Sequence, residues 1–384
     1  GGIYMGDVLD GLGNVVAEFV DGLVRNCVLT NNVCGNNNAN PGTTSTLNGG
    51  GAFLSAGLMD SCTVVGNKNM HYMEGLDHHM RGQGAVYVSG EAELRNSLVA
   101  GNLCDMGAQG ILVEGANAKV VNCTVAGNGQ AGYDYKQTAY ESVIKSGLVA
   151  NTVIYGNGQD GEAPSDHLIY MWQGKLQHLT VSNGCSSAAS GGGVCCMNSV
   201  TVNTNVIVTC CKAQNGGGIY SGVWNNCQVI GNESTGSGGG VYRSKMVGGV
   251  ISGNVSSGES GGGVYKANLY DVVVSNNTAK SHGGGVYNPA DSDGTPYGVS
   301  NCTVVCNTNS AAKTYAAGQT TGVNDRTAGV SVYAGTVKNC IIAKNWSTTD
   351  GCVTNLKGSV TYSLVDDRAS LAGTGNKVGD PKFR

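Results

Sequence analysis

The chain has 384 residues, of which 63 are glycine and 5 are proline, while 12% are charged and 40% are hydrophobic. The hydrophobic share excludes a disordered chain, and so much glycine with so few charges indicates strands joined by many turns. The 22 basic and 26 acidic residues give a formal net charge of −4, and no long run of either sign occurs. Nucleic-acid binding through a basic face is therefore not predicted.

The sequence opens directly in a repeat motif, Gly1-Gly2-Ile3-Tyr4, without an initiator methionine or a recognisable signal peptide. We expect a mature or trimmed product from which the signal peptide has been removed. The apolar stretch from Val15 to Val24 is interrupted by Glu18 and Asp21. No stretch reaches the roughly 18–20 apolar residues that span a bilayer, so no transmembrane segment is predicted.

A seven-residue motif of the form Asn-Cys-x-Val-x-Gly-Asn recurs along the chain and is clearest at Asn226 to Asn232. Cys227 and Val229 alternate with polar neighbours, which is the period of a half-buried strand, and the closing Asn or Gly suits a turn with positive φ. Copies lie about 22 residues apart or further, so each copy predicts one coil, with loops in the longer intervals. Thirteen copies begin at Asn26, Ser61, Asn96, Asn122, Asn151, His178, Asn205, Asn226, Gly248, Asp271, Asn301, Asn339 and Thr361.

Residues 1–190 contain loop-decorated coils, and three of their loops hold most of the residues capable of chemistry. Each loop follows the closing position of its coil, so all three are expected to leave the same corner and line one groove. Tyrosines and carboxylates there suit sugar stacking and hydrogen bonds to sugar hydroxyls. The candidate groove residues are His71, Glu74, Asp77, His78, His79, Tyr133, Asp134, Tyr135, Asp160, Glu162, Asp166 and His167.

The loop from Lys68 to Arg81 invites a metal or acid–base interpretation because it holds half of the six histidines. It lacks the HExxH spacing, so a solvated insertion is the favoured interpretation. Asp291-Ser292-Asp293-Gly294 begins like a calcium loop but lacks the later ligands, which indicates a turn. We predict neither a bound metal nor a cofactor.

Residues 191–300 are predicted to form regular short coils. The motif Gly-Gly-Gly-(Val/Ile)-Tyr begins at Gly216, Gly238, Gly261 and Gly283, at spacings of 22, 23 and 22 residues. The expected core is a stack of Val, Ile, Cys and Tyr. Residues 301–384 are expected to form the last coils, with an Ala/Thr/Gly-rich loop over 310–327 and a short tail.

The 15 cysteines occupy fixed places in the repeat, so most are interpreted as small buried apolar residues. Cys27 with Cys62, and Cys302 with Cys340, hold the same position in consecutive coils. Parallel Cβ vectors would keep the Cβ atoms of each pair about 4.8 Å apart, beyond the usual disulfide range of roughly 3.5–4.5 Å. These thiols are predicted to be free.

Together these patterns predict an all-β, single-domain right-handed parallel β-helix, a solenoid of about 13 coils over residues 1–384, with loop insertions in the N-terminal half and near the C-terminus. The paired glycine and Asn motifs resemble the right-handed parallel β-helix repeat proteins of bacterial surfaces, including those of the polymorphic outer-membrane protein type. The segment from Gly379 to Arg384 is similar to the Asp-Pro-x-Phe stretch that often ends such β-helices. We accordingly expect an extracellular or cell-surface location.

Two classes of function are compatible with this architecture. The first is a non-catalytic structural or adhesive protein that binds surface glycans weakly, or that assembles with itself end to end into filaments through the unpaired N–H and C=O groups of an open coil. The alternative is a polysaccharide lyase or glycoside hydrolase that uses the loop-lined groove. The regular coils favour the first, and no lyase signature is found.

Overall fold

The structure is a computed structural model. It describes residues 2–6, 8–9, 15–17, 21–35, 47–70, 82–104, 107–130, 139–156, 167–185, 190–198, 200–289, 294, 296–310, 328–333, 335–347, 359–365 and 373–382. Within these ranges every regular element is a β-strand. The chain falls into two compact units, one of residues 1–186 and 194–201 and the other of residues 187–193 and 202–384.

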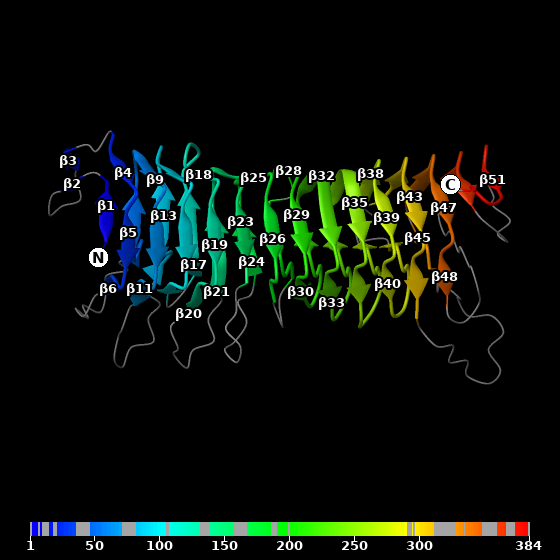
Figure 1. The fold of residues 1–384 in the computed structure, drawn as a ribbon. Coiled ribbons are helices and arrows are strands. Elements are labelled where there is room, and N and C mark those ends of the chain that lie inside the picture. The colour runs from blue at the N-terminus through cyan, green and yellow to red at the C-terminus, as the bar shows by residue number, and fades with distance from the viewer. Residues whose placement is uncertain are drawn as a thin grey trace. The chain divides into compact units, whose positions relative to one another are not determined.

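The first unit consists of short parallel strands that pair with their equivalents one coil further along the chain (Figure 1). One row contains β1 (Ile3–Met5), β8 (Ala52–Leu54), β13 (Val86–Ser89), β17 (Gly107–Glu114), β21 (Ala139–Ile144), β24 (His167–Met171) and β27 (Val194–Cys196). A second row contains β4 (Leu23–Arg25), β9 (Leu58–Asp60), β14 (Glu93–Arg95), β18 (Lys119–Val121), β22 (Leu148–Ala150) and β25 (Lys175–Gln177).

A third row of this unit contains β5 (Val28–Thr30), β10 (Thr63–Val65), β15 (Leu98–Ala100), β19 (Thr124–Ala126), β23 (Val153–Tyr155) and β26 (Thr180–Ser182). A smaller parallel sheet contains β6 (Val33–Gly35), β11 (Lys68–Met70), β16 (Leu103–Cys104) and β20 (Gly129–Gln130). The strands β7 (Leu47–Asn48) and β12 (Gly82–Gln83) pair in parallel, whereas β2 (Val8–Leu9) and β3 (Val15–Ala17) pair antiparallel.

The second unit repeats the same arrangement. Its first row contains β31 (Ile219–Tyr220), β34 (Val241–Tyr242), β37 (Val264–Tyr265), β41 (Val286–Asn288) and β45 (Val330–Val332). Its second row contains β28 (Val202–Thr204), β32 (Val223–Ile230), β35 (Lys245–Ser252), β38 (Asn268–Tyr270), β42 (Val299–Ser300), β46 (Thr336–Lys338) and β49 (Ser359–Thr361). The long strands β32 and β35 also pair with a third row of β29 (Ile207–Thr209), β39 (Val273–Ser275), β43 (Thr303–Val305), β47 (Ile341–Ala343), β50 (Leu364–Val365) and β51 (Lys377–Val378).

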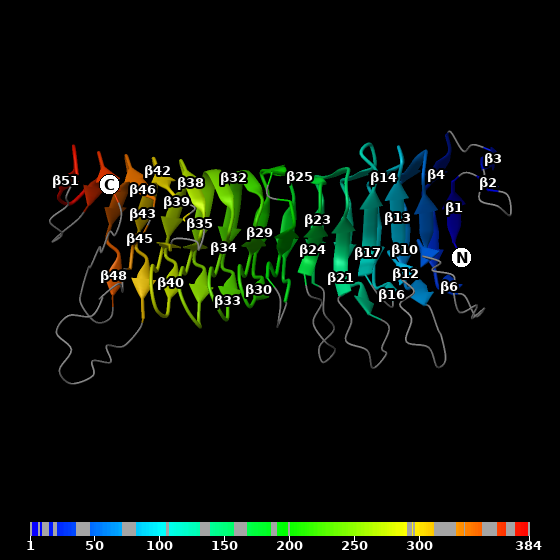
Figure 2. The same cartoon turned by 180° about the vertical axis from the view of Figure 1, so that it is seen from behind.

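A separate parallel sheet of the second unit contains β30 (Lys212–Ala213), β33 (Glu233–Ser234), β36 (Val255–Ser256), β40 (Thr278–Ala279), β44 (Thr308–Asn309) and β48 (Trp346–Ser347). Figure 2 labels four of them: β30, β33, β40 and β48. The pairings in this sheet are parallel and, from β30 to β40, join residues 21 to 23 positions apart, which is about one coil. The predicted all-β parallel solenoid is thus the architecture of the described chain.

Inward positions carry the core in both units. Val64, Val99 and Val125 stack in register in the first unit, and Val229, Ile251 and Val274 do so in the second, each fully buried. The predicted inward register of Cys227 and Val229 is confirmed. The prediction that Tyr belongs to the core is wrong: Tyr220, Tyr242, Tyr265 and Tyr287 point outward and are half-buried, and Val or Ile precedes each of them on the inside.

The corners between strands are left-handed. In twelve of the thirteen motif copies the first residue has positive φ, and in the last copy the position shifts from Thr361 to Tyr362. A second positive φ falls one residue before the closing Asn, as at Gly231. The positive φ expected at the closing Asn or Gly is thus confirmed for the Gly and wrong for the Asn, because Asn232 is buried inside the coil and makes hydrogen bonds there.

The second and third glycines of a triplet are required by close contacts with the neighbouring main chain and with this buried Asn. A Cβ on Gly218 would lie 2.9 Å from the Asn232 Nδ2 atom and 2.9 Å from the Gly240 carbonyl oxygen, and one on Gly217 would lie 2.2 Å from the Glu233 carbonyl oxygen. Only glycine allows the main chain to approach the Asn side chains so closely.

Among the described residues no helix is long and apolar enough to cross a membrane.

Candidate functional site

The segments that carry the candidate groove residues lie between strands of the first unit. Loop 71–81 follows β11 and loop 131–138 follows β20, and these two strands lie in one parallel sheet on either side of β16. Loop 157–166 ends at β24, where His167 is paired with Tyr140 of β21. Parallel strands end at the same edge of a sheet, so β11 and β20 end at one edge.

Eleven of the twelve candidate groove residues lie outside the described residues: His71, Glu74, Asp77, His78, His79, Tyr133, Asp134, Tyr135, Asp160, Glu162 and Asp166. Their joint role in a groove stays a prediction. The structure describes His167, which is 6% exposed and whose ring stacks on Tyr140 at 5.5 Å and on Tyr170 at 5.8 Å between ring centroids. Tyr140 also stacks on Tyr170, and the three rings form one aromatic cluster on β21 and β24.

A buried carboxyl that the sequence reasoning missed lies beside this cluster. Glu141 takes the place that the third glycine of the triplet holds in other coils, because Ser142 pairs with Ile111, the residue after Gly110. Its Oε1 atom accepts a hydrogen bond of 2.6 Å from Asn128 Nδ2, while Oε2 has no partner. Complete burial raises the pKa of Glu141 to about 8. The signal in the sequence was an acidic residue in a glycine position.

An Asn ladder runs inside each unit. In the first, the side chains of Asn32, Asn67, Asn102 and Asn128 each donate to the next, and Asn128 donates to Glu141. In the second, Asn232, Asn254, Asn277, Asn307 and Asn345 form a continuous ladder with N···O distances of 2.9–3.0 Å. Each amide also donates to a main-chain carbonyl of the preceding coil, as Asn277 does to Ile251. Every step therefore joins two coils through a buried polar group that is hydrogen-bonded.

The cysteines of the motif form hydrogen bonds with main-chain groups at the corners. The thiol of Cys227 donates to the carbonyl of Asn225 at 3.3 Å and accepts from the Val206 N–H one coil earlier at 3.4 Å. Ser97 and Thr152 make the same pair of contacts with their hydroxyls in other coils. Burial raises the pKa of the Cys227 thiol to about 11, so it remains a protonated donor at neutral pH. The cysteines are thus hydrogen-bonding groups as well as small apolar ones.

The two stacked cysteine pairs are free in the structure. Cys62 donates to the carbonyl of Asp60 at 3.2 Å, and Cys340 donates to that of Lys338 at 3.2 Å. Within the second unit the thiols of Cys302 and Cys340 interact with each other, which raises the pKa of Cys302.

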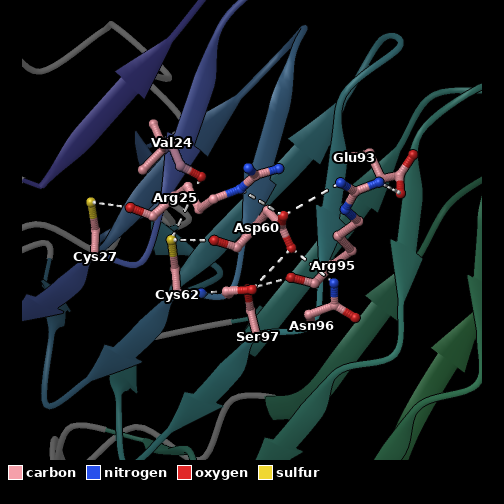
Figure 3. A network of polar contacts seen from close by, with 10 residues as sticks. Val24, Arg25, Cys27, Asp60, Cys62, Glu93, Arg95, Asn96 and Ser97 are labelled. Carbon is pink, nitrogen blue, oxygen red and sulfur yellow. Dashed lines mark hydrogen bonds and ion pairs between the residues drawn. The ribbon is translucent and has the colours of Figure 1, made fainter.

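A charged network lies on the outer face of the first unit (Figure 3). Asp60 accepts from Arg25 at 3.0 Å on one side and from Arg95 at 3.4 Å on the other, so three consecutive coils carry alternating charges. Asn96 donates to the same carboxylate at 2.8 Å. The hydrogen bonds from Asn96 and Arg95 hold the pKa of Asp60 well below its usual range. This network joins coils and leaves no free carboxylate for acid–base work.

A tyrosine ladder lies on the outer face of the second unit. The rings of Tyr220, Tyr242 and Tyr265 stack with centroid distances of 5.4 and 4.9 Å. Arg243 and Lys266 each place their charge over the ring of the preceding tyrosine, at 5.9 and 5.6 Å from the ring centroid. The sequence analysis did not single out these cations.

No group of three or more His, Cys, Asp or Glu side chains that could hold a metal ion occurs within the described ranges. No known protein-family model matches the sequence, and no curated protein matches it. A solved structure with some similarity is the TibC-catalysed, hyper-glycosylated TibA55-350 fragment, which is 11% identical. That alignment covers 92% of this chain and 94% of the other, with a TM-score of 0.30, too low to support an inference about function.

Proposed function

We propose that the chain is a non-catalytic scaffold, extracellular or on a cell surface, with a structural or adhesive role, built as one right-handed parallel β-helix domain of about 13 coils. The observation that carries this proposal is the use of the polar side chains. The Asn ladder of the second unit joins five positions, and each amide from Asn232 to Asn307 connects its own coil to the next one. Groups capable of chemistry are thus engaged in holding coils together.

The same use of side chains recurs in the first unit. Asp60 bridges Arg25 and Arg95, Lys145 pairs with Glu114 at 3.0 Å, and the corner thiols bond to main-chain groups. A protein selected to persist as a long stack of coils requires such contacts, whereas a catalytic site requires polar groups that face a substrate. Glycan contacts by the groove residues of the three loops are proposed as shallow and non-catalytic.

The test is a depolymerisation assay on the full chain with polygalacturonate, alginate and a neutral glucan, following new reducing ends. No release is expected from any of them. The triple variant H71A/H78A/H79A serves as the matched reference for the histidine-rich loop. Release by the wild type that disappears in the triple variant would overturn the scaffold proposal in favour of a lyase or hydrolase.

We also propose that a second copy can stack on the coil formed by β4, β5 and β6. In the described part of the chain each of these strands pairs on one side only, with β9, β10 and β11. Leu23, Val28 and Val33 of this coil are 59%, 69% and 61% exposed. Unpaired strand edges that carry apolar side chains are templates for pairing with another chain, so end-to-end assembly is the expected mode.

A further inference from the structure

The ends of four neighbouring strands in the first unit, β17, β21, β24 and β27, bring four side chains together. The last buried residues of these strands are in register, and main-chain hydrogen bonds of 2.8–2.9 Å continue the pairing by one residue. The residues that align there are Glu114, Lys145, Trp172 and Met197. Consecutive coils lie about 4.8 Å apart, so Trp172 has Lys145 as its neighbour on one side and Met197 on the other.

The apolar part of this surface is exposed and is held in place by other aromatic rings. Trp172 is 55% exposed and Met197 is 56% exposed. The indole of Trp172 meets the ring of Tyr170 edge-on, with 6.3 Å between the ring centroids and an interplanar angle of 65°. Tyr170 in turn stacks on Tyr140 at 4.5 Å and packs against a cluster of buried hydrophobic residues. An exposed ring that is fixed in this way loses little conformational freedom when a ligand covers it.

The polar part of this surface is an ion pair with further hydrogen-bonding capacity. Lys145 Nζ lies 3.0 Å from Glu114 Oε2, and that oxygen also accepts from the Tyr87 hydroxyl at 3.2 Å. The Lys145 and Glu114 side chains are 41% and 40% exposed. Glu114 Oε1 has no hydrogen-bond partner within the described part of the chain, and an ammonium group carries three donors. The pair therefore offers an acceptor and donors side by side, without a net charge.

A sugar ring has the two kinds of surface that this arrangement complements. Its C–H groups form an apolar face that packs on an aromatic ring, and its hydroxyls require both donors and acceptors. The ion pair favours a neutral sugar over an acidic one, because an acidic group would meet the carboxylate of Glu114 as well as the ammonium of Lys145. A stable interface with another protein requires roughly 20–30 residues a side, whereas this surface consists of a few neighbouring side chains.

We propose that the surface formed by Glu114, Lys145, Tyr170, Trp172 and Met197 binds a neutral polysaccharide. A sugar ring packs on the indole of Trp172, and hydroxyls of the same or the next sugar form hydrogen bonds with the Glu114–Lys145 pair. None of the candidate groove residues belongs to this surface. The inference rests on the adhesive scaffold function proposed above and names a ligand class for it.

The experiment measures binding of the full chain to an immobilised β-glucan, galactomannan and arabinoxylan, with polygalacturonate as the acidic reference and phosphatidylcholine vesicles as a lipid surface. The first test variant is W172A, and its matched control is W346A, because Trp346 is 53% exposed in the second unit. The second test variant is E114A/K145A. Its matched control is K212A/E233A, which removes a pair at 3.0 Å with side chains that are 46% and 41% exposed. Circular dichroism and the thermal midpoint establish that all four variants fold.

Binding to at least one neutral polysaccharide, with little change in high salt, is the expected result. W172A should bind about tenfold more weakly and E114A/K145A roughly fivefold more weakly, while both controls stay within about twofold of the wild type. Binding to none of the neutral polysaccharides, an equal loss in the controls, or a preference for polygalacturonate or the vesicles would each overturn the inference. None of these outcomes affects the scaffold proposal, which is overturned only by depolymerisation.

Discussion

The Glu141 carboxyl is a proton-binding group inside the fold. Its pKa is raised from 4.5 to about 8, so below pH 4.5 it is protonated in both the folded and unfolded states and has no net effect. As the pH rises from 4.5 to 8, the unfolded chain loses this proton first. Deprotonation then stabilises the unfolded chain relative to the folded state. The loss of stability is on the order of 3 kcal/mol at pH 7.

The variant E141Q is expected to remove this pH dependence. Glutamine keeps an oxygen for Asn128 and carries no titratable proton, so its thermal midpoint should equal that of the wild type near pH 4.5 and exceed it at pH 7 and above. E114Q, at the partly exposed pair with Lys145, is the control. A difference between wild type and E141Q that is the same at every pH would contradict the buried position of this carboxyl.

The Asn ladder predicts a second residue-scale effect. In N277L, both the main-chain N–H and the side-chain amide of Asn254 lose the Asn277 Oδ1 acceptor, and the Ile251 carbonyl loses a donor. Buried groups left without partners cost about 1–3 kcal/mol each, so the free energy of unfolding measured in denaturant should fall by several kcal/mol. The adjacent N276G is the control, because Asn276 is exposed with φ of 56° and glycine suits that conformation. Wild-type stability of N277L would refute the ladder.

At the level of a strand, the alternation of inward and outward positions makes its own prediction. Val229 lies between Val208 and Ile251 in the core and is 0% exposed. V229D would bury a carboxylate with no cation beside it, which costs several kcal/mol, and cooperative unfolding should be lost. Q228D places the same charge one residue away on the exposed face and should melt within a few degrees of the wild type. Similar melting of both variants would refute the register.

The strands and their inward faces could be predicted from the sequence because apolar and polar residues alternate along a strand with a period of two, as at Cys227 and Val229. A positive φ was predicted for the closing Asn or Gly and is found at Gly231, whereas the positive φ of Asn226 and its equivalents was not predicted. The role of the closing Asn could not be predicted, because Asn favours left-handed turns and also satisfies buried hydrogen bonds, and the sequence does not distinguish these uses. Asn232 makes buried hydrogen bonds.

The site was less predictable than the fold. Loop composition identified the candidate groove residues, of which the structure describes His167, packed against Tyr140 and Tyr170. The burial of Glu141 and the alignment of Arg243 with Lys266 were not predicted because each depends on register between coils. Only alignment of coils shows that a glutamate fills a glycine position, or that Arg243 and Lys266 share a corner.

At the scale of the whole molecule, self-assembly is the testable property. The full chain is expected to form larger species with rising concentration, and V28K/V33K should reduce this, because two charges on the open coil disfavour edge pairing. L98K is the control, since Leu98 aligns with Val28 through Thr63 but belongs to a coil paired on both sides. Light scattering that detects monomers alone at high concentration, or equal suppression by L98K, would refute the proposed contact.

The Asn ladder also determines where such a chain can gain or lose residues. Its successive members in the second unit are 22, 23, 30 and 38 residues apart, yet the amide distances stay at 2.9–3.0 Å. Register is thus counted in coils and not in residues. Insertions and deletions between two ladder members are absorbed without disturbing the next coil, so the loops are free to diversify while the ladder positions are held fixed.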